Sequence, residues 1–134
     1  EINLTNEKNN GLAVLKLIKD NLVQSAHDIS SGGILVSLAE MSMFSGLGLK
    51  IFKPKKLTNH IEYFFGEDQG RYLIEISPNN KSKVENILKK NNVFFDHVAE
   101  VQNDTFEIEK VLNLKIKDLH FYNNQWYKKY NGIN

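Results

Sequence analysis

Residues 27–33 combine the groups that bind phosphate in many proteins: an imidazole, a carboxylate, hydroxyls and two glycines. They are His27, Asp28, Ser30, Ser31, Gly32 and Gly33, with an isoleucine at position 29. Glycines let the backbone approach a ligand closely, and the first N–H groups of a helix attract anions. The stretch therefore predicts a phosphate or nucleotide-phosphate site. The alternative is an Asp or Ser cap on a buried helix, with the glycines serving only the turn.

A second polar motif, Gly-Glu-Asp-Gln-Gly-Arg, occupies residues 66–71. Glu67 and Asp68 are suited to Mg²⁺ or a ribose hydroxyl, Gln69 to an amide or base, and Arg71 to a phosphate or to the two carboxylates. The alternative is a solvated turn with an internal Arg–Glu pair. Because each motif lies beside an expected strand, the two together favour a ligand cleft more than either does alone.

Other catalytic patterns are weak in this sequence. The four histidines are scattered, so we expect no metal site built from them. His27, next to Asp28, has two interpretations. Its imidazole lies at the edge of a ligand, or it is a structural histidine at a strand end whose hydrogen bonds are satisfied within the protein. Walker and Rossmann loops are missing, and no residue is identified as a catalytic base. The candidate site is therefore one for binding rather than for chemistry.

Hydrophobic periodicity predicts the elements that must position both motifs. Helices are expected over residues 6–24, 33–44 and 81–91, with Asn79 capping the third, and a short helix is one interpretation of residues 57–65. Expected strands cover residues 23–29, 47–52, 71–76, 93–101 and 105–109, the last two forming a hairpin. A terminal amphipathic helix carries Ile116, Leu119, Tyr122, Trp126 and Tyr130. This irregular alternation predicts an α+β fold, with helices covering a mixed β-sheet.

Composition bounds the function. A length of 134 residues, 41% of them hydrophobic, predicts one domain with a real core. A net charge of +1 without a basic stripe argues against nucleic acid as a partner. No apolar run approaches a membrane span and no signal peptide is recognisable, while zero cysteines fit a reducing cytoplasm. We therefore expect a cytoplasmic domain without a membrane partner. Because the chain opens at Glu1 rather than at Met, we expect a piece of a longer protein.

Two motifs identify a family. The first motif, continued by Leu-Ala-Glu-Met at 38–41 and Ser-Gly-Leu-Gly at 45–48, resembles the signature of the aminoimidazole ribonucleotide synthetase-related, ATP-dependent superfamily. That superfamily also includes selenophosphate synthetase and thiamine-phosphate kinase. Residues 65–72, Phe-Gly-Glu-Asp-Gln-Gly-Arg-Tyr, resemble a segment near the C-terminus of the phosphoribosylformylglycinamidine synthases. The closing Leu119 and Trp126–Tyr127 are similar to the end of those chains, so the resemblance covers essentially the whole sequence.

The resemblance implies the C-terminal domain of an enzyme of purine biosynthesis that converts an amide to an amidine with ATP, Mg²⁺ and ammonia. It implies a three-layer α+β domain, like the C-terminal domain of aminoimidazole ribonucleotide synthetase. The implied partners are the remaining half-domains of the same enzyme and a glutaminase subunit that delivers the ammonia. In that family this domain is tied more to an auxiliary nucleotide site than to the reaction, so the isolated chain is expected to be inactive.

One departure from the family pattern is Ser31, where the family usually has Asp. If that Asp helps to bind a metal, binding is weakened here; if it only caps the helix, Ser31 serves equally. The resulting hypothesis is a nucleotide or phosphate site formed by eight residues: His27, Asp28, Ser30, Gly32, Gly33, Glu67, Gln69 and Arg71. The alternatives are a non-catalytic scaffold, whose polar motifs brace contacts with other half-domains, and a part of another superfamily member such as selenophosphate synthetase.

Overall fold

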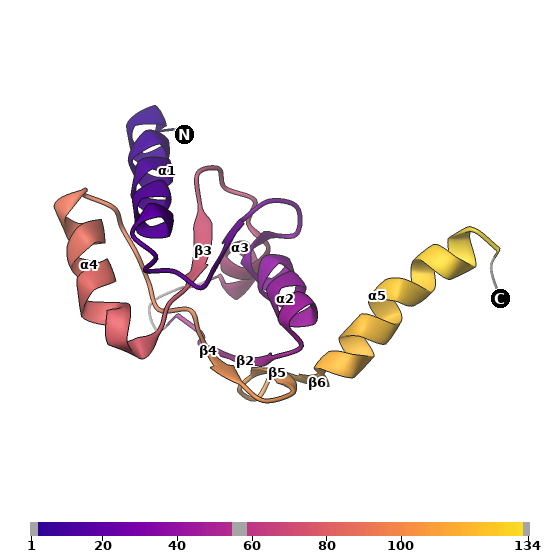
Figure 1. Ribbon diagram of the computed structural model, residues 1–134. Coiled ribbons are helices and arrows are strands. Elements are labelled where there is room, and N and C mark those ends of the chain that lie inside the picture. The colour runs from indigo at the N-terminus through magenta and orange to yellow at the C-terminus, as the bar shows by residue number, and fades with distance from the viewer. Residues whose placement is uncertain (1–2, 55–58, 133–134) are drawn as a thin grey trace. The chain divides into compact units, whose positions relative to one another are not determined.

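A computed structural model describes residues 3–54 and 59–132 (Figure 1). The chain forms two compact units, each built from two separate segments. Unit 1 consists of Glu1–Ser37 and Ile61–Asp96, and unit 2 of Leu38–His60 and His97–Asn134. Both candidate motifs belong to unit 1, so the site can be described within that unit alone.

The described residues of unit 1 form α-helices and a two-stranded antiparallel sheet. Its helices are α1 (Leu4–Lys19), α3 (His60–Phe65, which begins at the unit boundary) and α4 (Lys81–Lys90), the last preceded by the short 3₁₀ helix η1 (Pro78–Asn80). Strand β1 (Ser25–Asp28) pairs with β3 (Tyr72–Glu75), so that Asp28 lies opposite Tyr72. Antiparallel pairing places the end of β1 beside the start of β3. The first polar motif begins in the last two residues of β1 and the second ends just before β3, so the two motifs meet at one end of this sheet.

The core of unit 1 lies where α1 and α4 pack together. Ala13 and Leu17 of α1, Leu22 and the α4 residues Val84 and Leu88 form a buried cluster. Around it pack partly buried side chains from β3, α4 and the flanking loops: Val23, Ile74, Ile76, Ile87, Val93 and Phe95. The two helices each supply a narrow apolar stripe at helical spacing, which is enough to bury one face of each.

Unit 2 is built on a four-stranded mixed sheet of order β4-β2-β5-β6 (Figure 1). The strands are β2 (Gly48–Ile51), β4 (Ala99–Gln102), β5 (Thr105–Ile108) and β6 (Leu112–Lys115), and only the β2–β5 pairing is parallel. Ile51, Phe106 and Ile108 are buried on the two central strands. Helix α5 (Ile116–Tyr130) follows β6 directly. Helices on a mixed sheet confirm the α+β fold expected from the sequence.

Helix α2 (Gly33–Ser45) begins in unit 1 and ends in unit 2. Its bounds confirm the expected helix at 33–44. The terminal helix is confirmed as α5, and the ambiguous segment at 57–65 contains α3, although residues 55–58 lie outside the described part of the chain. Among the described residues no helix combines the length and apolar character that a bilayer crossing requires.

The expected hairpin between residues 93–101 and 105–109 is wrong. The first segment overlaps a strand only at its last three residues, where β4 (Ala99–Gln102) begins, and β2 lies between β4 and β5. Gly48 makes this arrangement possible, because an added Cβ would lie 2.1 Å from the backbone oxygen of Thr105. The hairpin partner of β5 is β6, a strand that the sequence analysis did not predict.

Two helix boundaries also differ from the expectation. Helix α1 begins at Leu4, where the Asn3 side chain accepts from the Asn6 N–H, and ends at Lys19 rather than at 24. Asn21 follows with a φ of 52°, a left-handed conformation that ends a helix. Asn79 does not cap α4, because the N-cap position of α4 is Asn80, whose side chain makes no capping hydrogen bond. The Ser77 side chain instead caps η1 by accepting from the Asn79 N–H.

Candidate functional site

The Gly32–Gly33 turn is fixed by sterics as well as by backbone conformation. Both glycines have positive φ, 81° and 69°. A Cβ on Gly32 would lie 2.4 Å from a methyl carbon of Val36, and one on Gly33 would lie 2.7 Å from the backbone carbonyl carbon of Phe65. L-residues with side chains avoid this region of φ, and a Cβ cannot approach backbone so closely. The start of α2 therefore packs directly on the end of α3.

This close packing brings the second motif to the first. Phe65 ends α3 and Gly66 opens the second motif, so the chain passes the α2 N-terminus within the next two residues. There the Glu67 carboxylate accepts a hydrogen bond from the Gly32 N–H at 2.8 Å. The sequence predicts that the two motifs share a site, and the structure joins them by this contact between residues 35 positions apart.

The Glu67 contact gives the α2 N-terminus an anion from within the protein. A carboxylate at the start of a helix satisfies an N–H group without an intrahelical partner and interacts favourably with the helix dipole. From the sequence, Glu67 is expected to bind Mg²⁺ or a ribose hydroxyl, and the Gly32 amide is expected to bind phosphate. In the structure these two groups bind each other, so a phosphate at Gly32 requires the Glu67 side chain to rotate away.

Arg71 is held inside the second motif. Its guanidinium donates to the Asp68 carboxylate at 3.3 Å and to the Gly66 carbonyl at 3.5 Å. Its side chain is 27% exposed, whereas that of Asp68 is 79% exposed. The expected internal ion pair is therefore present, with Asp68 rather than Glu67 as the partner. The Arg71 carbonyl also accepts from the Ile29 N–H at 2.9 Å, which ties the second motif to the first along the backbone.

The remaining predicted residues sit around this pair of loops. The Asp28 side chain is 70% exposed at the end of β1, and the His27 Nδ1 atom contacts the Asp28 backbone carbonyl. The Ser30 carbonyl accepts from the Gly33 N–H at 3.0 Å and closes the turn. Gln69 is exposed. The structure thus gathers all eight predicted residues into unit 1, and the side chains of Asp28, Glu67 and Gln69 are open to solvent.

Two nearby residues were missed by the sequence analysis. Asn10 of α1 donates from its side chain to the Gly70 carbonyl at 2.9 Å and holds the second loop against that helix. Tyr63 of α3 is half-buried; burial raises its pKa, the Asp96 charge raises it further, and Arg71 lowers it. Neither residue belongs to a local motif, because both reach the site through tertiary contacts. A sequence pattern offers no signal for them.

The charge of the site is unfavourable for a free anion. Asp28, Glu67 and Asp68 supply three carboxylates, while Arg71 supplies one guanidinium that is already paired with Asp68. Like charges repel an incoming phosphate unless a cation accompanies it. Within residues 3–54 and 59–132, however, no group of three or more His, Cys, Asp or Glu side chains is placed to hold a metal ion. The residues present therefore fit a magnesium-bound nucleotide only in part.

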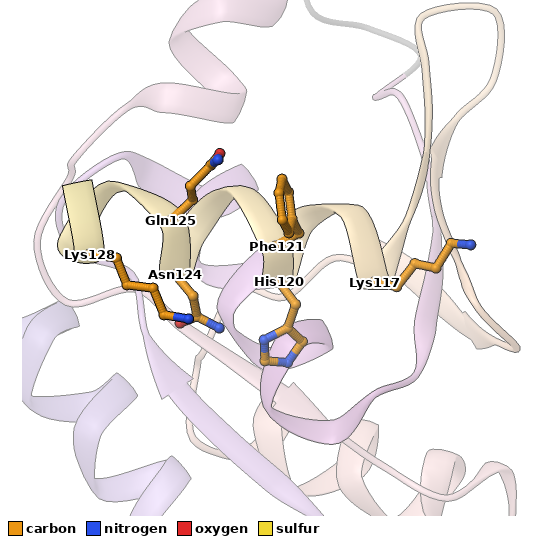
Figure 2. A pocket seen from close by; sticks show the side chains of 6 residues that line it. All are labelled: Lys117, His120, Phe121, Asn124, Gln125 and Lys128. Atoms are coloured by element: carbon orange, nitrogen blue, oxygen red, sulfur yellow. The ribbon is translucent and has the colours of Figure 1, made fainter. Parts of the chain in front are cut away.

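A pocket lies elsewhere, along α5 in unit 2. It measures about 280 Å³, and Figure 2 shows its lining side chains, all of which project from that helix. Phe121 and Gln125 extend to one side of α5, and His120, Asn124 and Lys128 to another. The His120 Nε2 atom contacts the Met43 carbonyl near the end of α2. Neither polar motif contributes to this pocket.

Comparison with known proteins gives consistent matches. A family model described as AIR synthase related protein, C-terminal domain, matches residues 2–111. The phosphoribosylformylglycinamidine synthase subunit PurL of Pelagibacter ubique is 43% identical over 130 residues, which cover 97% of this chain and 18% of that protein. The PurL subunit of Bartonella bacilliformis is 35% identical over 131 residues, or 98% of this chain and 18% of its own length. The chain thus spans about a fifth of these relatives.

Solved structures give the same result. Thermotoga maritima PurL in complex with FGAR shares 26% identity and a TM-score of 0.72, covering 84% of this chain and 20% of that one. The same protein in complex with AMPPCP shares 25% identity and a TM-score of 0.74, over 84% of this chain and 21% of that one. The fold of the present chain is therefore the fold of one part of those larger proteins.

Proposed function

This chain belongs to the AIR synthase related protein, C-terminal domain, family, and from that premise we propose that it is the C-terminal domain of an ATP-dependent phosphoribosylformylglycinamidine synthase of purine biosynthesis. The whole enzyme would convert formylglycinamide ribonucleotide to its amidine, using ATP and glutamine-derived ammonia. Identity of 43% across 97% of the chain to one such synthase subunit carries this proposal. The joined motifs of unit 1 are the part of the domain that would serve the enzyme.

Within the intact enzyme we propose a binding role for the site rather than a catalytic one. Asp28, Glu67 and Gln69 would face a nucleotide, with the Gly32–Gly33 backbone and Ser30 near its phosphates. Arg71 would fix the loop that carries Glu67, since its guanidinium bonds within that loop. ATP would be the nucleotide, and Mg²⁺ would offset the charge of the three carboxylates. Neither motif supplies a base or a nucleophile in a catalytic arrangement, so we expect the isolated domain to be inactive.

The partners would be the other domains of the synthase and a glutaminase subunit. A solved neighbour described as the Thermotoga maritima PurLQS structure supports an assembly of several subunits for that protein. The location of the enzyme would be the cytoplasm, as expected for an ATP-dependent enzyme of purine biosynthesis.

Calorimetry of ADP with Mg²⁺ on the intact synthase tests the binding role. Asp28→Ala and Glu67→Ala should each weaken binding at least tenfold, since a hydrogen bond to a charged group contributes about 1.5–3 kcal/mol. Glu109→Ala is the matched control, because Glu109 is an exposed acid of unit 2 whose carboxylate pairs with Lys110 at 3.8 Å. Unchanged affinity in both site variants would refute the binding role.

A structural role for the same motifs is the second candidate. The Glu67 carboxylate already satisfies the Gly32 amide, an arrangement that holds α2 and the second loop together without a ligand. Under this alternative Glu67→Ala lowers the melting temperature of the synthase and leaves nucleotide affinity unchanged. The same two measurements therefore separate the candidates.

A further inference from the structure

Helix α5 carries an aromatic stripe that its own unit leaves uncovered. The stripe consists of Ile116, Leu119, Tyr122, Trp126 and Tyr130, which recur at steps of three and four and so share one helical face. Ile116 is only 4% exposed, but exposure rises to 70% at Tyr122, 60% at Trp126 and 80% at Tyr130. The stripe thus starts in the core of unit 2 and continues onto open surface.

The exposed part of the stripe has the composition of an interface. Trp126 packs edge-on against Tyr130, with ring centroids 5.7 Å apart, and against Tyr127 at 6.1 Å. Trp and Tyr bury large apolar areas, and the Trp N–H and Tyr O–H groups remain able to form hydrogen bonds at the edge of an interface. These two residue types are enriched among the residues that contribute most of the binding energy. Aromatic residues three and four positions apart on a helix typically bind in a hydrophobic groove that accepts one face of the helix.

Helix α5 lies outside the shared family module. The family model ends at residue 111, five positions before the helix begins. The synthase relatives nevertheless align over 97–98% of this chain, which takes the similarity into α5. The helix is therefore shared with the synthase relatives but is not part of the domain that the family model describes. This suggests that the surface to which the helix binds belongs to the synthase.

Resting on the proposed function, we propose that the α5 stripe docks into an apolar groove on another domain of the same synthase polypeptide. The relatives are about five times as long as this chain, so most of the polypeptide is available as the acceptor. Covalent linkage also raises the effective concentration of such a groove far above that of a second molecule.

Adjacent asparagines provide a matched pair for the test. Successive residues of a helix are rotated by about 100°, which places Asn123 on the stripe side and Asn124 on the face drawn in Figure 2. Both are exposed in this structure. Asn123→Cys and Asn124→Cys, made separately in the intact synthase, are alkylated with a maleimide, and the α5 peptide is quantified by mass spectrometry over time. The substitutions leave every aromatic side chain of the stripe in place.

We expect Cys at position 123 to react at least tenfold more slowly than Cys at 124, equally at low and high protein concentration and without other subunits. Adding Trp126→Glu should remove that protection, whereas Gln125→Glu should not. Equal rates at 123 and 124 would overturn the proposal. So would protection that disappears on dilution, which indicates a second copy, or protection that requires another subunit. No nucleotide enters the measurement, so its outcome is independent of the binding test on Asp28 and Glu67.

Discussion

Replacing Gly33 with alanine tests whether the contact between α2 and α3 builds the site. Gly33 has a φ of 69°, and an added Cβ would lie 2.7 Å from the Phe65 carbonyl carbon and 2.8 Å from the Phe64 oxygen. The left-handed conformation costs about 1–2 kcal/mol for a residue with a side chain. The overlap is with backbone, which cannot rotate away, and overpacking of this kind costs about 1–3 kcal/mol. Gly33→Ala should therefore destabilise the fold by about 2–5 kcal/mol.

Gly46, at the other end of α2, is the matched control. Its φ is 73°, nearly that of Gly33, but an added Cβ would meet nothing within 4 Å. Gly46→Ala should therefore show the conformational cost alone, about 1–2 kcal/mol. The difference between the two variants isolates the contact with α3. At about 4 °C per kcal/mol for a chain of this size, that difference corresponds to roughly 4–12 °C in melting temperature.

The assay is urea unfolding of the 134-residue chain followed by far-ultraviolet circular dichroism, with thermal melting as a second measure. Gly33→Ala should also lower the protection of the Gly32 N–H against hydrogen exchange, since that N–H donates to Glu67 only while the two loops remain in place. Equal destabilisation by the two glycine substitutions would refute the reasoning. It would mean that the α3 backbone shifts at no cost and does not fix the second motif.

Two further predictions concern single side chains of α2 and of the unit 2 sheet. Within the part of the chain that the structure describes, the Ser42 hydroxyl is buried without a hydrogen-bond partner, whereas Ser37 donates to the Gly33 carbonyl at 3.1 Å. Ser42→Ala should thus leave stability unchanged or raise it by about 1 kcal/mol, and Ser37→Ala should lower it by about 1 kcal/mol, in the same urea experiment; the opposite order would contradict this. The hydrogen bond from Lys115 to Asp104, 2.8 Å long, lowers the pKa of that carboxyl. The ionised Asp104 carboxylate therefore stabilises the fold fully above its unfolded-state pKa, and this stabilisation is lost as pH falls through the folded-state pKa. In an NMR titration, Lys115→Gln should return the pKa of Asp104 toward its ordinary value. A pKa that stays low in Lys115→Gln would assign the shift to another cause.

Local patterns of the sequence determined much of this protein. Helix α2 starts at Gly33 because Gly-Gly turns the chain and a largely apolar segment follows. Helix α5 follows from apolar residues at steps of three and four. The eight residues proposed for the site follow from their types and from the family motifs that they resemble, because carboxylates, hydroxyls, glycines and an arginine grouped in two short runs are visible in a sequence directly. Their role in binding stays a prediction.

Tertiary structure decided the pairing of these parts. Alternation of apolar and polar residues predicts a strand but does not identify its neighbour, so β2 lies between β4 and β5 where a hairpin was expected. The contact of Glu67 with the Gly32 N–H and that of Asn10 with the Gly70 carbonyl join residues 35 and 60 positions apart. Such contacts depend on which backbones can approach closely, and this is set by packing across the whole unit rather than by any short run of residues. For that reason the two motifs can be located in the sequence, whereas only the fold shows that the Glu67 carboxylate of the second motif accepts a hydrogen bond from the Gly32 N–H of the first.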